Sequence, residues 1–183
     1  MNTIRNITLL LLGILLVSHC THSGNAERDF EIHTMAKAQK MAELEQKKIV
    51  VHVYTDWCAW CKKLEREVYT DERIGQIVNE YYYAVRLNAE SEEEIIFNGR
   101  KIKMSELSAS LGVKTYPTTV FIDSNGQTIG QQVGYMEVEV FEKLLAYVGS
   151  NAYKSVLFDD FSVSNLPLKI GPSSAPDSNK STN

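Results

Sequence analysis

Trp57-Cys58-Ala59-Trp60-Cys61 is the stretch of the 183-residue chain that decides the fold. Two cysteines at this spacing also occur in zinc sites, copper carriers and short structural disulfides, so the spacing alone is only moderately specific. The pair follows a β-branched run at residues 49–54 and precedes a stretch of helical composition at residues 62–68. A cysteine at the start of a helix meets unpaired backbone N–H groups and the positive end of the helix dipole, which favour its thiolate. This placement indicates a redox-active dithiol.

The sequence on either side of this pentapeptide alternates between helical and extended patterns. Apolar residues at helical spacing predict helices at residues 34–46, 62–68, 71–81, 105–111 and 137–148. β-Branched and aromatic runs predict strands at residues 49–54, 83–87, 118–122 and 128–133. Asn98-Gly99 between apolar flanks predicts a small β-hairpin insertion. Strands separated by helices predict an α/β fold, with a central mixed β-sheet flanked by helices.

Composition restricts the class of protein. Hydrophobic residues make up 44% and charged residues 23% of the chain, which argues against a wholly disordered chain and a multi-spanning membrane protein. The chain has a formal net charge of −4, whereas a general nucleic-acid binder has an excess of basic residues. Three cysteines are too few for a disulfide scaffold, so the fold must rest on a hydrophobic core.

Residues 1–26 are predicted to be a signal peptide that is removed on export. The apolar run at residues 7–17 would span about 16 Å as a helix, roughly half of a bilayer's hydrocarbon core. Gly24-Asn25-Ala26 has the small residues that signal peptidase favours. Alternatively, residues 17–20 resemble a bacterial lipobox, with Cys20 as a lipidated anchor. Both interpretations predict an exported, periplasmic protein.

The other end of the chain is predicted to be a disordered polar tail at residues 171–183. This stretch contains two prolines, four serines and one apolar side chain. It cannot bury enough apolar surface to offset the entropy of ordering. The folded domain is therefore expected to cover residues 27–170.

Three motifs in order resemble the thioredoxin-fold family. They are the Trp-Cys-x-x-Cys-Lys run at residues 57–62, the Tyr-Pro-Thr segment at residues 116–118, and Gly134 after the last strand. The resemblance covers about residues 30–150. The Cys-Ala-Trp-Cys-Lys-Lys start and the helix break near residues 70–71 are most similar to exported thiol-disulfide oxidoreductases of this family. These include bacterial disulfide isomerase-like proteins and the C-terminal domain of the transmembrane disulfide reductase.

The resemblance implies roles for individual residues. Cys58 corresponds to the attacking cysteine and Cys61 to the resolving cysteine, and the two would form the redox disulfide. Pro117 corresponds to the family's cis-proline, and the backbone of Tyr116 would pair with an extended substrate segment. Trp57 is expected to lie beside that segment. The resemblance implies neither a metal nor another cofactor.

Two positions depart from the family pattern. His52, six residues before Cys58, stands where thioredoxins carry a buried aspartate that handles the proton of the resolving thiol. It is either a proton-transfer group or a core histidine with a satisfied hydrogen bond. Arg86 would face this histidine rather than a carboxylate, which favours a neutral imidazole. Trp60 stands where strongly oxidising relatives place histidine, which favours a reductase or isomerase and makes Trp60 a substrate-binding candidate.

The leading hypothesis is therefore an exported protein-disulfide reductase or isomerase acting through Cys58 and Cys61. We expect a monomer that acts on disulfide-containing exported proteins, receives electrons from a membrane thiol donor and binds no nucleic acid. One alternative is a zinc- or copper-binding module using the same cysteines together with His33 and His52. The other is a non-catalytic binding or chaperone module on the same scaffold.

Overall fold

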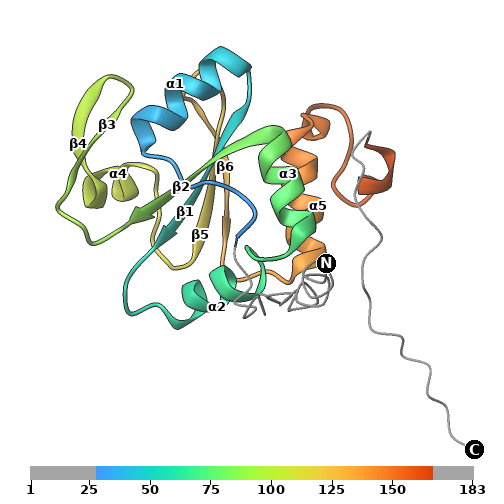
Figure 1. Ribbon diagram of the computed structural model, residues 1–183, viewed down its shortest axis with the longest axis horizontal. Coiled ribbons are helices and arrows are strands. Elements are labelled where there is room, and N and C mark those ends of the chain that lie inside the picture. The colour runs from blue at the N-terminus through green and yellow to red at the C-terminus, as the bar shows by residue number, and fades with distance from the viewer. Residues whose placement is uncertain (1–27, 167–183) are drawn as a thin grey trace, which may run out of the picture.

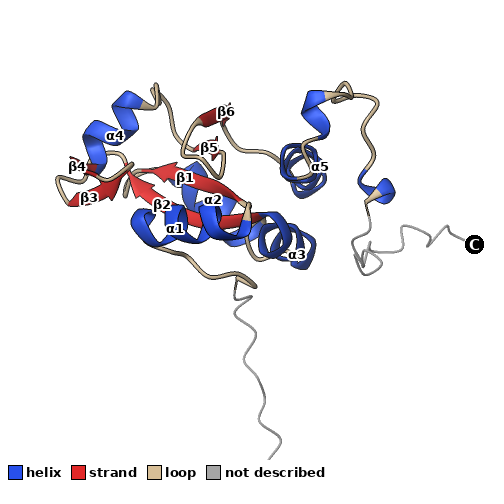
Figure 2. Ribbon diagram, turned by 90° about the horizontal axis from the view of Figure 1, so that it is seen from above, coloured by secondary structure: helices blue, strands red, loops and turns tan. Residues whose placement is uncertain are grey.

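A computed structural model describes residues 28–166 (Figures 1 and 2). The predicted signal peptide, with Cys20 and the candidate cleavage site, lies outside the described residues, and so does the predicted polar tail. None of the helices within residues 28–166 combines the length and apolar character needed to cross a bilayer.

The predicted elements are present with small shifts in their bounds. The helices are α1 (Met35–Glu45), α2 (Ala59–Glu67), α3 (Glu72–Tyr81), α4 (Met104–Ser110) and α5 (Val138–Gly149). The strands are β1 (Lys48–Tyr54), β2 (Tyr82–Asn88), β3 (Glu94–Phe97), β4 (Arg100–Lys103), β5 (Thr118–Ile122) and β6 (Thr128–Val133). Two short 3-10 turns follow, η1 (Ala152–Lys154) and η2 (Val163–Asn165).

The central sheet is mixed, with strand order β2-β1-β5-β6. β1 pairs with β2 in parallel and with β5 antiparallel, and β6 pairs with β5 antiparallel. A single parallel bridge between Ile32 and Ala84 extends the sheet beyond β2. The hairpin β3–β4 forms a separate two-stranded sheet, seen at the flank of the domain in Figure 1. The predicted α/β fold with a hairpin insertion is thus confirmed.

The sheet separates two apolar cores. Ile49, Val51 and Val53 of β1 pack with α1 and α4 on one face, whereas Val50 packs with α2, α3 and α5 on the other. Because both faces of β1 are covered, the run from Ile49 to Val53 is apolar rather than alternating except at His52, and Lys48 at the start of the strand is also buried.

The break between α2 and α3 is set by a cap. The Asp71 carboxylate accepts a hydrogen bond from the Arg73 backbone N–H at 2.9 Å and starts α3. α2 is therefore a short, separate helix at one end of the sheet, while α3 and α5 lie side by side (Figure 1). This arrangement leaves the start of α2 accessible at that end of the domain.

A segment with no predicted element folds back against α5. The Tyr147 hydroxyl donates a hydrogen bond to the carbonyl oxygen of Val156 at 2.6 Å. The Tyr147 ring also lies 5.3 Å from the ring centroids of Phe158 and Phe161. Residues 150–166 thus cover the outer face of α5 through aromatic contacts that have no helical or strand period.

Candidate active site

Cys58 and Cys61 form a disulfide at the start of α2. Cys58 is the N-cap residue, and the Cys61 backbone N–H points at its Sγ atom, 3.0 Å away. The Cys58 backbone N–H is bonded to the carbonyl oxygen of Thr55 at 3.2 Å, which ties the helix start to the end of β1. The cap geometry therefore places one sulfur in contact with the first backbone N–H groups of the helix.

The two sulfur-bearing residues differ little in exposure. Cys58 exposes 4% of its surface and Cys61 exposes 1%. A cysteine at a helix start is commonly reached by solvent, and Cys58 in the disulfide state is more enclosed than that. In this state the neighbouring side chains limit the access of solvent and of a partner to the Cys58 sulfur.

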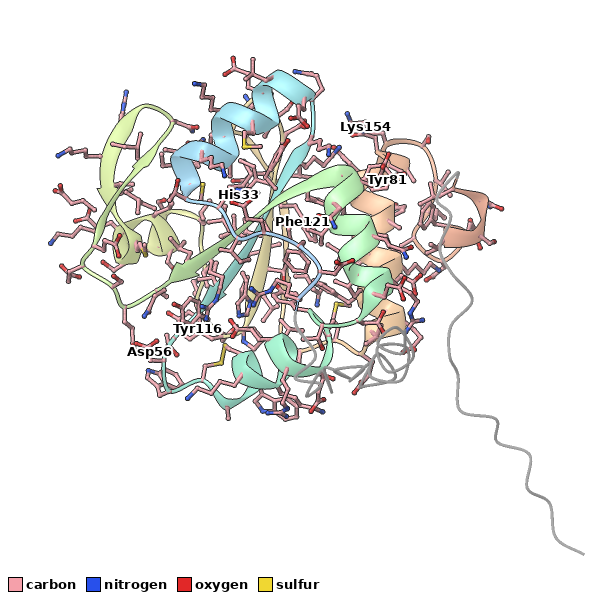
Figure 3. All side chains as sticks on the ribbon, in the orientation of Figure 1. His33, Asp56, Tyr81, Tyr116, Phe121 and Lys154 are labelled. Atoms are coloured by element: carbon pink, nitrogen blue, oxygen red, sulfur yellow. A yellow bond between two sulfur atoms is a disulfide. The ribbon has the colours of Figure 1, made fainter. Side chains whose placement is uncertain are left out.

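The loop before β5 lies beside the disulfide. The Tyr116–Pro117 peptide bond is cis, as the family resemblance implied. The Tyr116 ring packs edge-on against Trp57 with their centroids 6.0 Å apart. Gly134 donates its backbone N–H to the Pro117 carbonyl oxygen at 2.8 Å and adopts a φ of +89°, which suits glycine. Figure 3 shows Tyr116 and Asp56 at the same end of the domain as the disulfide.

Two exposed indoles flank the disulfide. Trp57 exposes 66% of its surface and Trp60 exposes 56%, which is unusual for such large apolar side chains. Trp57 is held by Glu90, and Trp60 lies 5.5 Å from the ring of Tyr135. Sequence reasoning missed Glu90 and Tyr135. The position of Tyr135 directly after Gly134 was a usable signal, because that glycine was already placed near the site.

A partly buried polar cluster lies beneath α2, with the side chains of Glu65 and Arg86 exposed by 23% and 35%. His52, with 2% of its side chain exposed, places Nε2 at 3.4 Å from Oε1 of Glu65. Arg86 Nη2 lies 2.7 Å from the same oxygen. The imidazole stacks on Tyr54 at 5.7 Å and meets Tyr69 edge-on at 5.3 Å. We call this His52–Glu65–Arg86 cluster, on the inner side of α2, the floor of the site.

The expectation that Arg86 faces a histidine without a carboxylate is wrong. Glu65 lies between the two, because it follows Cys61 by four residues and so shares the buried face of α2. The pattern of residues 62–68 predicts only a helix. The four-residue spacing of Glu65 from a buried cysteine was the signal that could have found it.

The electrostatics of the cluster favour a neutral imidazole beside a carboxylate anion. Burial lowers the pKa of His52 and outweighs the opposing effect of Glu65, while the charge of Arg86 lowers it further. Burial raises the pKa of Glu65, but contacts with His52 and Arg86 outweigh it and leave the pKa below its usual value. Neither ring nitrogen of His52 has a partner with hydrogen-bond geometry among the residues that the structure describes. His52 therefore contacts Glu65 through Nε2 alone, and its two interpretations, proton-transfer group and core histidine, both stay predictions.

His33 and His52 lie on opposite faces of the central sheet. His33 packs edge-on against Tyr83 at 5.3 Å, on the α1 side of the sheet, whereas His52 lies on the α2 side. Within residues 28–166 no group of three or more His, Cys, Asp or Glu side chains is arranged to hold a metal ion. The structure thus does not bring His33 to the cysteine pair.

Comparison with known proteins agrees with this geometry. A family model described as a thioredoxin-like domain matches residues 35–149. The chain is 24% identical over 127 residues to the thiol:disulfide interchange protein DsbD of Actinobacillus pleuropneumoniae, covering 68% of this chain and 20% of that protein. It is 30% identical over 114 residues to DsbD of Tatumella citrea, covering 60% of this chain and 18% of that protein. The chain thus spans about a fifth of the length of these relatives.

A solved structure shows the same fold. A thioredoxin-fold protein from Helicobacter pylori superposes with a TM-score of 0.56 and 24% sequence identity. The match covers 63% of this chain and 76% of that one. The arrangement of the sheet and helices is therefore common to both proteins.

Proposed function

The chain belongs to the family of thioredoxin-like domains, and from this premise we propose that it is an exported protein-disulfide reductase or isomerase. The working group is the Cys58–Cys61 dithiol. The observation that carries the proposal is this pair, joined as a disulfide at the start of α2 beside the cis Tyr116–Pro117 loop. Thiol chemistry at a helix start next to an edge of extended backbone suits a polypeptide disulfide as substrate.

The reaction is a pair of thiol–disulfide exchanges. In the reduced protein the Cys58 thiolate attacks one sulfur of a substrate disulfide, a Cys58–substrate bond forms, and the other substrate sulfur leaves as a thiolate that takes a proton from solvent. The Cys61 thiolate then attacks Cys58 Sγ, the Cys58–Cys61 disulfide forms, and the second substrate thiolate departs. Two electrons pass from the dithiol to the substrate, which is reduced.

The proton of Cys61 needs an acceptor inside the protein. Cys61 exposes 1% of its surface, so bulk water has little access to its thiol. Glu65 lies one helical turn further along the same buried face and is held as an anion by Arg86. We assign Glu65 as the acceptor, with His52 sharing the proton across their 3.4 Å contact.

Substrate binding is assigned to the exposed side of the same site. The Tyr116 backbone before Pro117 would pair with an extended substrate segment, and the faces of Trp57 and Trp60 would contact its side chains. The relatives are named as thiol:disulfide interchange proteins, which supports a disulfide as the substrate. We propose exported proteins as the carriers of that disulfide and a membrane thiol as the electron donor. In this scheme residues 1–26 direct export, or Cys20 carries a lipid anchor, and the domain acts as a monomer.

Insulin reduction tests the proposal. Reduced wild-type protein should accelerate the precipitation of insulin B chain in the presence of dithiothreitol, and Cys58→Ser should not. The equilibrium of the Cys58–Cys61 pair with glutathione then separates a reductase, with a low potential, from an isomerase with a higher one. A folded protein that neither reduces insulin nor exchanges with glutathione, and that binds zinc or copper, would instead support the metal-binding alternative.

Export is tested separately by the intact mass of the protein in cell fractions. A periplasmic product that begins at Glu27, or a lipidated product that begins at Cys20, agrees with the proposal. A cytoplasmic product that retains Met1 would contradict it.

A further inference from the structure

The exposed aromatic side chains beside Cys58 form two pairs. Trp57, directly before Cys58, packs with Tyr116 of the cis-proline loop, and Trp60 packs with Tyr135 after β6. We call them the Trp57 wall and the Trp60 wall. Because Cys58 exposes only 4% of its surface between these large exposed side chains, a partner that reaches its sulfur must contact them. The two walls differ in how their charges are balanced.

The Trp60 wall has a cation of its own. Lys63 Nζ lies 5.2 Å from the ring centroid of Trp60 and 4.4 Å from that of Tyr135. Glu67 Oε2 lies 3.5 Å from the same ammonium group and balances its charge. The aromatic rings of this wall are thus already in contact with the Lys63 ammonium group, which occupies the position that a substrate cation would take.

The Trp57 wall has the opposite composition. Trp57 Nε1 lies 3.0 Å from both carboxylate oxygens of Glu90, and the exposed Glu90 therefore sits at the indole edge. Asn88 connects this carboxylate to a second one: its side-chain amide donates to Asp56 Oδ2 at 3.2 Å and its side-chain oxygen accepts from the Glu90 backbone N–H at 3.0 Å. This wall thus carries two carboxylates, one on the indole edge and one linked to it through Asn88, beside an indole residue that is 66% exposed.

Neither carboxylate is neutralised by a cation of the described chain. The ion pairs among residues 28–166 include neither Glu90 nor Asp56. Lys62 and Lys114 are the lysines nearest to Trp57 and Tyr116 in sequence, and both are exposed and form no such pair. Arg86, four residues before Glu90, pairs with Glu65 instead. An anion hydrogen-bonded to the positive edge of an indole makes the ring face more attractive to a cation.

From this asymmetry we infer that the site selects polypeptide disulfides with an arginine or lysine next to the reactive cysteine. The basic side chain lies on the face of Trp57 with its charge towards Glu90 and Asp56, while the Trp60 wall accepts an uncharged side chain. The inference rests on the proposed function and names its substrate class. It is continuous with the redox site, because Asp56 and Trp57 directly precede Cys58.

Matched cystine peptides test the inference. Three symmetrical peptides differ only in the residues on both sides of cysteine, which are arginine, leucine or glutamate. The rate of attack by reduced wild-type protein is divided by the rate of attack by dithiothreitol on the same peptide, because neighbouring charge alters the intrinsic reactivity of a disulfide. We expect the normalised rate for the arginine peptide to exceed that for the glutamate peptide about tenfold at low salt, with leucine between them. In about 0.5 M NaCl the ratio should fall towards two to three.

Variants locate the effect. Glu90→Gln keeps an oxygen that can accept the Trp57 N–H bond, so the indole stays in place while one charge is removed. In Glu90→Gln combined with Asp56→Asn, the arginine-to-glutamate ratio should fall to about two. Glu137→Gln is the matched control, because Glu137 contacts Tyr135 of the other wall at 3.1 Å and its loss should leave the ratio unchanged.

The outcomes separate the inference from the proposed function. A normalised ratio near one in the wild type, or an unchanged ratio in the folded double variant, would overturn the inference while the proposed function stands. Failure of the reduced wild-type protein to reduce any of the three peptides would overturn both. Melting temperatures of the variants show whether each is folded.

Discussion

The solvent side and the buried side of α2 differ in composition, and the proposed reaction gives them different tasks. On the solvent side Trp57 and Trp60 expose more than half of their surfaces, and their charged neighbours Glu90 and Lys63 lie on separate walls. On the buried side the 2%-exposed His52 shares a single carboxylate with an arginine. In the proposed reaction, partner recognition therefore takes place in water, where single contacts contribute little, and proton transfer takes place beneath α2, where one charge has a larger effect.

This contrast predicts which substitutions matter most. A charge removed from the outer walls changes which peptides react but leaves the chemistry of the cysteines in place. A charge removed from the floor changes the chemistry itself. Substitutions far from both regions should alter only the free energy of unfolding. The following predictions test these expectations, from the largest expected effect to the smallest.

Removing the carboxylate of Glu65 should have the largest effect short of losing a cysteine. In Glu65→Gln the Cys61 proton loses its acceptor, so resolution of a preformed Cys58 mixed disulfide should slow about 10- to 100-fold near pH 7. The rate should also rise tenfold per pH unit, as expected when hydroxide takes the proton. Rapid-quench kinetics of a Cys58–thionitrobenzoate mixed disulfide measure both quantities.

Glu67→Gln is the control for this prediction. Glu67 lies on the same helix but its carboxylate is exposed and pairs with Lys63 and Arg66. Its rate and pH profile should match the wild type. If folded Glu65→Gln also resolved the mixed disulfide at the wild-type rate with the same pH profile, Glu65 would have no part in proton transfer.

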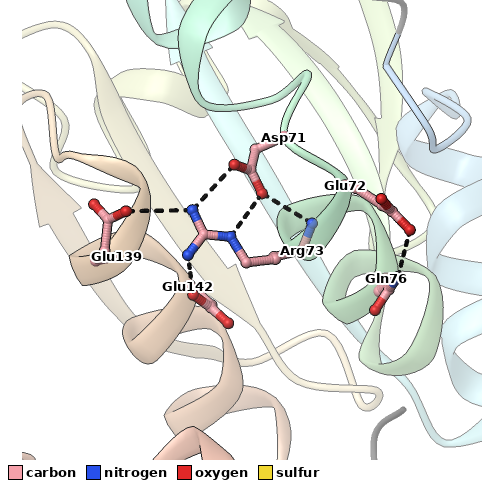
Figure 4. A network of polar contacts seen from close by, with 6 residues as sticks. All are labelled: Asp71, Glu72, Arg73, Gln76, Glu139 and Glu142. Carbon is pink, nitrogen blue, oxygen red and sulfur yellow. Dashed lines mark hydrogen bonds and ion pairs between the residues drawn. The ribbon is translucent and has the colours of Figure 1, made fainter. Parts of the chain in front are cut away.

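Arg73 provides a test at a distance from the site. Its guanidinium joins Asp71 at the start of α3 to Glu139 and Glu142 of α5, at N–O distances of 3.1 to 3.3 Å (Figure 4). Arg73→Met leaves three carboxylates without their cation and should lower the free energy of unfolding by about 1–3 kcal/mol, measured by urea denaturation. The rates of attack and resolution per folded molecule should stay unchanged. A slowed resolution step would show that general loss of stability, rather than a local charge, controls the chemistry.

The floor of the site should also make stability depend on pH. Burial lowers the pKa of His52 and of His33 in the folded protein below the ordinary value of about 6.5. Below that pH the unfolded chain takes up protons that the folded chain does not. The associated stability is therefore complete above about pH 6.5 and is lost as the pH falls below it, by at most about 1.4 kcal/mol per pH unit for each histidine.

Two variants divide this pH dependence. His52→Gln and His33→Gln should each flatten the curve of unfolding free energy between about pH 7 and pH 5. Only His52→Gln should also slow the resolution step, because His33 lies on the opposite face of the sheet. Equal kinetic effects of the two variants would contradict the assignment of His52 to the floor of the active site.

The smallest effect is expected at Tyr135. Its hydroxyl lies 3.1 Å from Glu137 and 3.4 Å from Glu67, and burial and these carboxylates raise its pKa to about 12. Tyr135→Phe removes these partly exposed contacts but keeps the ring against Trp60, so unfolding free energy should change by about 0.5 kcal/mol or less. Thermal unfolding and insulin reduction should both stay near wild type. A large loss of activity would mean that the hydroxyl itself binds the substrate.

Much of the fold could be predicted from the sequence, because its elements follow local rules. Short local patterns predict three of these elements: the β-branched run predicts β1, the Asn98-Gly99 turn predicts the hairpin, and the apolar period predicts α5. The disulfide of Cys58 and Cys61 and the cis Tyr116–Pro117 bond could be predicted because the motifs around them, taken in order, resemble the thioredoxin-fold family.

The parts that escaped prediction depend on distant neighbours. The partnership of Glu65 with Arg86 joins α2 to β2, and that of Trp57 with Glu90 joins the residue before Cys58 to the loop after β2. An isolated glutamate has the same helical propensity whether it points to solvent or under a helix. The aromatic packing of residues 150–166 on Tyr147 has no sequence period at all.

The measurement that tests the account most directly is trapping by the two cysteine variants. Cys61→Ser keeps the sulfur at the helix start, where the backbone N–H of residue 61 meets Cys58 Sγ at 3.0 Å, but cannot resolve, whereas Cys58→Ser keeps only the sulfur within α2. Each variant is expressed in cells, free thiols are blocked with acid and iodoacetamide, and mixed disulfides are separated on non-reducing gels and identified by mass spectrometry. We predict that Cys61→Ser accumulates mixed disulfides with exported proteins and that Cys58→Ser accumulates almost none. Equal trapping by both variants, or trapping by neither, would contradict the assignment of Cys58 as nucleophile and Cys61 as resolving cysteine.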